Sequence, residues 1–89
     1  MSAEMTDLKA RFEAAAVDSK KLPEKPDNST LLKLYALFKQ ASEGDIQGER
    51  PGGFDFVAAA KHDAWIKLHG MSRETAMQGY ISEVERLRG

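Results

Sequence analysis

The chain has 89 residues, a mass of 9.9 kDa and a nearly balanced charge, with 13 Lys and Arg against 14 Asp and Glu. A chain this short has room for one core, so we expect residues 1–89 to form a single domain. The absence of cysteine excludes disulfides, thiolate catalysis, iron–sulfur clusters and cysteine-based zinc sites.

The charge and the first residues also bear on partners and compartment. Binders of duplex nucleic acid usually carry a basic surplus, which this chain lacks, so we expect no nucleic-acid partner. Acidic residues stand near the start, where a signal peptide needs a basic segment, and no apolar run approaches the roughly 18 residues of a membrane span. We therefore expect a cytoplasmic monomer without stable membrane insertion.

Apolar residues recur at spacings of three and four in four segments, which predicts four amphipathic helices. The first segment runs from about Met5 to Leu22, with Thr6 as a candidate N-cap and a stop at Pro23. The second begins after residues 27–29, any of which could cap it, and ends near Gly44.

The other two helices follow a loop. Residues 44–54, GDIQGERPGGF, contain four glycines and a proline, so we expect a loop of about a dozen residues. The third helix is predicted from Val57 to Leu68, before Gly70, and the fourth from the N-cap Ser72 to Leu87. A loop this long can cross a bundle, so the second and third helices can run parallel. The pattern predicts an all-α four-helix bundle.

Motifs for catalysis or metal binding are missing from the sequence. There is no glycine-rich nucleotide-binding pattern, and His62 and His69 do not form the His-Glu-x-x-His zinc motif. The loop acids Asp45, Glu49 and Asp55 do not match the spacing of a calcium loop. No nucleophile, base and orienting group come together, so we expect no enzyme activity, no catalytic residue, no metal and no cofactor.

Two lysines lie close to aromatic residues on the predicted helices. Lys61 falls inside the apolar stripe of the third helix, one turn before Trp65, and Lys39 follows Tyr35 by four residues and adjoins Phe38. Two interpretations remain open. The lysines could lay their methylenes along an apolar surface and keep their ammonium groups in water. Alternatively, lysines from different helices could meet aromatic rings in an anion site suited to a nucleotide phosphate and base.

Seven separated motifs resemble the acyl-CoA-binding protein family, which includes the diazepam-binding inhibitor or endozepine type. They are Tyr35-Ala36-Leu37-Phe38-Lys39-Gln40-Ala41, Gly44-Asp45-Ile46, Glu49-Arg50-Pro51-Gly52, Asp55-Phe56, Lys61-His62-Asp63-Ala64-Trp65, Ala76-Met77 and Tyr80-Ile81. The resemblance runs without a gap from about Phe12 to Leu87. It implies a bundle of up-down-down-up topology and non-catalytic binding of long-chain fatty acyl-CoA esters, as an intracellular carrier and pool former. The alternative class is a small helical protein-interaction module.

The resemblance also implies roles for individual residues. Tyr35, Lys39 and Lys61 match residues that bind the adenosine 3′-phosphate and its surroundings. Lys20 matches a further basic contact, and Tyr80 matches an aromatic residue that lines the nucleotide site. The stretch that touches the adenine and acyl moieties contains Ala36, Leu37 and Phe38. In the family, the first and last helices pack against each other, and the residues of this chain that match that interface are Phe12, Ala16, Tyr80, Ile81, Val84 and Leu87.

Three positions depart from the family pattern. Phe38 stands where the family usually has tyrosine, His62 replaces the first tryptophan of the common Lys-Trp-x-x-Trp, and Val57 replaces a frequent lysine. These changes remove a hydroxyl donor, apolar area and one charge, respectively. We expect them to affect affinity and chain-length preference, not the class of ligand.

Overall fold

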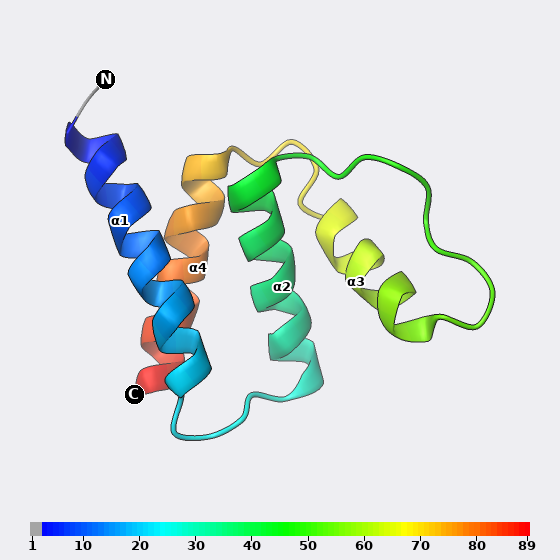
Figure 1. Ribbon diagram of the computed structural model, residues 1–89, viewed down its shortest axis with the longest axis horizontal. Helices are drawn as coiled ribbons and strands as arrows, with labels where there is room; N and C mark the ends of the chain where they lie inside the picture. The colour runs from blue at the N-terminus through cyan, green and yellow to red at the C-terminus, as the bar shows by residue number, and fades with distance from the viewer. Residues whose placement is uncertain (1–2) are drawn as a thin grey trace.

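The computed structural model describes residues 3–89, which contain four α-helices and one short 3-10 turn. The elements are α1 (Ala3–Asp18), η1 (Ser19–Lys21), α2 (Asn28–Glu43), α3 (Phe56–Ile66) and α4 (Arg73–Arg88). In Figure 1, α1 and α4 run downward, whereas α2 and α3 run upward, joined by the long segment that arcs around the outer side of α3. The predicted all-α bundle and its up-down-down-up topology are confirmed.

Side-chain caps fix the beginnings of the last three helices. Asp27 accepts a hydrogen bond from the Thr30 amide at 2.8 Å, and Ser72 accepts one from the Thr75 amide at 3.0 Å, as the sequence predicted. Asp55 does the same for α3, through the Ala58 amide at 3.0 Å. Each cap satisfies a backbone N–H that the helix leaves without an internal partner.

Three predicted boundaries are wrong. The first helix was predicted to reach Leu22, but α1 ends at Asp18 and the 3-10 turn Ser19–Lys21 follows it. α1 begins at Ala3, so Thr6 lies inside the helix, because nothing before Thr6 interrupts helical backbone. The side chain of Met5, predicted as apolar face, lies outside the described part. The α-helical part of the third segment stops at Ile66, and Leu68 follows in a tight turn, donating its amide to the Trp65 carbonyl at 2.9 Å.

The core lies between α1, α2 and α4. In the described part of the chain, α3 packs extensively against α2 and against no other helix. α2 and α4 approach closely at Gly79, where an added Cβ would lie 3.2 Å from Leu37 Cδ2. The buried core residues are Leu8, Phe12, Ala15, Leu34, Leu37, Ala41, Ala76, Tyr80, Ile81 and Val84. Ala16 and Leu87 pack partly buried against them, which confirms the predicted interface between the first and last helices.

An ion-pair group ties α2 to α4 outside this core. The Glu83 side chain is buried and accepts hydrogen bonds from Arg86 and from Lys33, whose Nζ lies 3.2 Å from Glu83 Oε1. The Arg86 hydrogen bond and then the Lys33 contact lower the pKa of Glu83. The glutamate therefore stays ionised at neutral pH, as a buried carboxylate must when it is paired.

Candidate functional site

Three aromatic rings from three helices meet at the centre of the bundle. Tyr80 on α4 stands edge-on to Phe12 on α1, with ring centroids 5.3 Å apart and an interplanar angle of 72°. Phe38 on α2 lies 5.4 Å from Phe12 and 5.8 Å from Tyr80. Phe12 and Tyr80 are buried, but Phe38 remains 39% exposed. The cluster therefore presents one ring face to the surface.

The Tyr80 hydroxyl is already used inside the protein. It donates to Ser19 Oγ at 3.0 Å, and Ser19 Oγ donates to the Ala16 carbonyl at 2.7 Å. This chain of bonds joins the end of α1 to α4. The Tyr80 hydroxyl therefore stabilises the fold and is not free to bond a ligand.

A hollow of about 340 Å³ opens beside this cluster. We call it the α1–α2 hollow. Four of the residues that the resemblance singled out line it, namely Lys20, Tyr35, Phe38 and Tyr80. The remaining lining residues are Ala16, Ser19, Pro26, Leu31 and Leu34. Aromatic side chains and the cation Lys20 suit a ligand in which an aromatic ring is joined to an anionic group such as a phosphate.

A second space of about 380 Å³, the α2–α3 groove, meets the first along α2. Leu31 and Tyr35 line both spaces. Lys61 also lines the groove, and its Nζ lies 5.2 Å from the centroid of the Tyr35 ring. The other lining residues are Asn28, Leu32, Phe56, Val57 and Ala60. A cation and a phenol thus stand at the junction, and a mostly apolar wall leads away from them.

Lys39 lies elsewhere. It pairs with Glu43, and its Nζ sits 5.1 Å from the centroid of the Trp65 ring. The hydrogen bond to Glu43 raises the pKa of Lys39, so its ammonium stays charged. Lys39 lines neither space, and although it adjoins Phe38 in the sequence, the two side chains face different helices. Neighbouring positions on a helix point about 100° apart, so Phe38 faces α1 and α4 while Lys39 faces α3.

Ala36 and Leu37 also lie outside the two spaces. They are 3% and 6% exposed, so they are packing residues of α2 in this structure. Both line a different hollow of about 560 Å³ between α2 and α3, together with Leu68 and Met71. Their predicted contact with adenine and acyl groups remains a prediction.

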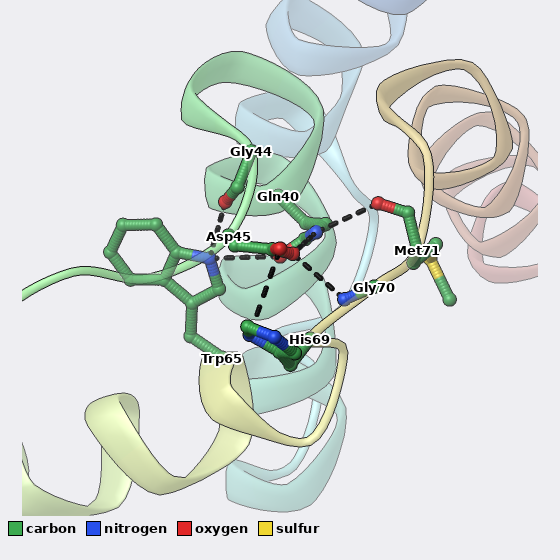
Figure 2. A network of polar contacts seen from close by, with 7 residues as sticks. All are labelled: Gln40, Gly44, Asp45, Trp65, His69, Gly70 and Met71. Carbon is green, nitrogen blue, oxygen red and sulfur yellow. Dashed lines mark hydrogen bonds and ion pairs between the residues drawn. The ribbon is translucent and has the colours of Figure 1, made fainter.

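A polar network centred on the buried side chain of Gln40, drawn in Figure 2, holds α3 in position on α2. The Gln40 side chain is fully buried, and its Nε2 donates to the Met71 carbonyl at 2.8 Å and to Asp45 Oδ1 at 2.9 Å. Its Oε1 accepts from the Trp65 indole at 3.1 Å, and the same indole donates to the Gly44 carbonyl at 3.0 Å. Gly44 ends α2 with φ near +80°, a conformation that glycine adopts without strain.

Asp45 is the acidic member of this network. Its Oδ1 also accepts the Gly70 amide at 2.8 Å, and this bond, followed by the one from Gln40, lowers the pKa of Asp45. The network therefore stabilises the fold while Asp45 is ionised. Sequence reasoning treated Asp45 as a loop acid and missed Gln40, although a glutamine within the apolar positions of α2 was a signal of buried hydrogen bonding.

A further pair fastens the long loop to α3. Arg50 donates from Nε to Asp63 Oδ1 at 2.8 Å and from Nη2 to Oδ2 at 3.0 Å. This two-bond geometry lowers the pKa of Asp63. The Arg-Pro-Gly and Lys-x-Asp motifs thus meet in space through one ion pair.

The histidines do not form a metal site with other side chains. His62 is buried in α3, and neither ring nitrogen has a hydrogen-bond partner within the described part of the chain. His69 is exposed, and its Nδ1 lies 3.7 Å from Asp45 Oδ2. Among the side chains that the structure describes, those of residues 7–89, no group of three His, Cys, Asp or Glu could hold a metal ion. Nor does this part of the chain contain a helix long and apolar enough to cross a membrane.

Known proteins share both the sequence and the fold. A family model described as acyl-CoA-binding protein matches residues 9–84. The chain is 47% identical to an acyl-CoA-binding protein homolog from Manduca sexta over 81 residues, 90% of each chain. It is 45% identical to an acyl-CoA-binding protein from Ricinus communis over 82 residues, which cover 92% of this chain and 91% of the relative.

The structural comparison agrees with the sequence comparison. The crystal structure of Oryza sativa acyl-CoA-binding protein 2 superposes with a TM-score of 0.86 at 41% identity, covering 90% of this chain and 89% of that one. The residues that the family model matches, 9–84, include all of α2, which carries Tyr35, and all of α3, which carries Lys61. The chain therefore belongs to the acyl-CoA-binding protein family.

Proposed function

We propose that this protein binds long-chain fatty acyl-CoA esters and carries them, chemically unchanged, as a monomer in the cytoplasm. Membership of the family supports the ligand class. The structural observation that carries the proposal is the junction at Tyr35, where the α1–α2 hollow meets the α2–α3 groove. A ligand with a charged aromatic head and an apolar tail needs two such spaces side by side.

The head of the ligand would occupy the α1–α2 hollow. The exposed part of the Phe38 ring offers stacking surface to adenine, with the buried Tyr80 ring packed behind it. Lys20 lines the hollow and Lys61 stands over Tyr35 at the junction, where both can attract phosphate. A hydrogen bond to a charged group contributes about 1.5–3 kcal/mol net. These contacts would set orientation and give the binding a salt dependence.

The tail would lie in the α2–α3 groove along Leu31, Leu32 and Val57. Burial of methylene groups contributes about 0.8 kcal/mol each, so a fully buried sixteen-carbon chain would gain on the order of 12 kcal/mol before ordering costs. The groove has a finite volume of about 380 Å³, so the gain from added methylenes should stop where the acyl chain outgrows it.

Isothermal titration with acyl-CoA esters of increasing length tests the proposal. We expect affinity to rise steeply with acyl length from butanoyl-CoA upward, then to level off where the groove ends. CoA without an acyl group serves as the control for the head alone. An affinity that is the same for all lengths would show that the tail is not buried, and absence of binding to any ester would refute the proposed function.

A further inference from the structure

The position of Lys39 is unexpected for a residue that matches a phosphate binder. Its ammonium is held between the Glu43 carboxylate, one helical turn further along α2, and the Trp65 ring. The ring cannot easily move aside, because its indole N–H is bonded to both Gln40 and Gly44. The Lys39 ammonium thus lies against a ring that is fixed by two hydrogen bonds, outside the α1–α2 hollow and the α2–α3 groove.

The other two cations of the predicted site are not restrained in this way. Lys61 stands over Tyr35 and Lys20 lines the hollow, and among the described side chains, residues 7–89, neither makes an ion pair with a carboxylate. Lys39 also follows Tyr35 by one helical turn, so a rotation of its flexible side chain would bring its ammonium toward the junction. Lys39 faces α3, as Tyr35 does where it lines the α2–α3 groove, so what keeps its ammonium from the Tyr35 junction is its ion-pair partner and its rotamer.

We propose that Glu43 is a positioning residue that holds Lys39 away from the ligand site, so that the ligand's phosphate must displace the Glu43 carboxylate from Lys39. This inference rests on the proposed function. A phosphate and a carboxylate compete for the same ammonium, and each occupies it by charge-assisted hydrogen bonds. The Lys39 and Glu43 side chains are 26% and 53% exposed, so the pair is partly solvated and can open. Glu43 would then lower the affinity for phosphorylated ligands without touching them.

Removal of the carboxylate should tighten binding. We expect Glu43→Gln to bind hexadecanoyl-CoA about two- to five-fold more tightly than the wild type by isothermal titration, the range that partly exposed ion pairs imply. Lys39→Ala should bind more weakly than the wild type. In the Lys39→Ala background, Glu43→Gln should give no further gain, because the residue that it releases is absent.

A matched variant separates this mechanism from a general effect of net charge. Glu85→Gln removes an equal charge from an exposed position on α4 and should leave the affinity unchanged. Equal tightening by Glu43→Gln in the presence and absence of Lys39 would overturn the inference, as would no tightening at all. If wild-type protein binds the ester and Glu43→Gln matches it, the inference alone fails. If the wild type does not bind, the proposed function fails with it.

Discussion

Replacement of Gln40 by glutamate is expected to destabilise the fold by about 3–5 kcal/mol at about pH 7, because it places an unpaired charge in a fully buried position. The glutamate cannot donate to the Met71 carbonyl or to Asp45, the two acceptors that Gln40 Nε2 serves. Two carboxylates would face each other where an amide now bridges them.

The defect of this variant should depend on pH. Burial and the neighbouring Asp45 raise the pKa of the introduced carboxyl, so the part of the destabilisation that comes from its charge is absent below the ordinary pKa of glutamate and develops as the pH rises. In the wild type the lowered pKa of Asp45 has the opposite consequence, since its stabilising effect is lost as the pH falls through that lowered value. The difference in unfolding free energy between Gln40→Glu and the wild type should therefore become smaller as the pH is lowered from about 7 to about 4.

Urea denaturation followed by circular dichroism measures both effects. Gln40→Ala is the control, because it removes three side-chain hydrogen bonds, about 1 kcal/mol each, without adding a charge. Its stability difference from the wild type should vary less with pH than that of Gln40→Glu. If Gln40→Glu were as stable as the wild type at about pH 7, the network of Figure 2 would not be what holds α3 on α2.

Truncation of Tyr80 should be the other large effect. Tyr80→Ala removes a ring that is 4% exposed and contacts both Phe12 and Phe38, so we expect a loss of about 3–5 kcal/mol in unfolding free energy. Tyr80→Phe retains the ring and loses only the hydrogen bond to Ser19, which is worth about 1 kcal/mol.

The two Tyr80 variants also separate packing from binding. Tyr80→Phe should retain most of the affinity for hexadecanoyl-CoA, because the hydroxyl that it lacks is already bonded to Ser19. Thermal and urea denaturation give the stability, and isothermal titration of the folded Phe variant gives the affinity. A Phe variant as unstable as the Ala variant would show that the hydroxyl, and not the aromatic cluster, dominates at this position.

The fold was predictable from the sequence to the level of helices and topology. Spacing of apolar residues placed all four helices, and the glycine-rich loop of about a dozen residues allowed α2 and α3 to run parallel. Helix ends were less predictable, because a candidate cap such as Thr6 competes with good helix-forming residues before it. Local patterns do not decide that competition.

The site was only partly predictable. The family resemblance implied that Tyr35 and Lys61 belong to one binding site, and in the structure the Lys61 Nζ lies 5.2 Å from the centroid of the Tyr35 ring. The i, i+4 spacing of Lys39 and Glu43 was visible in the sequence. Whether Lys39 contacts a carboxylate, the Trp65 ring or a ligand depends on how α3 packs on α2, which local spacing does not determine. The hydrogen-bond partners of Gln40 are Asp45, Trp65 and Met71, up to 31 residues away in the sequence, so local spacing does not predict them.

The affinity of Lys61→Ala for hexadecanoyl-CoA, measured beside its melting temperature, tests most directly whether cations at the Tyr35 junction hold the head of the ligand. Loss of one charge-assisted contact of about 1.5–3 kcal/mol predicts a roughly ten- to 150-fold weaker affinity with almost unchanged melting, because Lys61 is exposed and outside the core. Lys67→Ala, an exposed lysine just beyond the end of α3, should bind like the wild type. Equal affinities of Lys61→Ala and the wild type, or a loss of affinity matched by a loss of stability, would contradict this account.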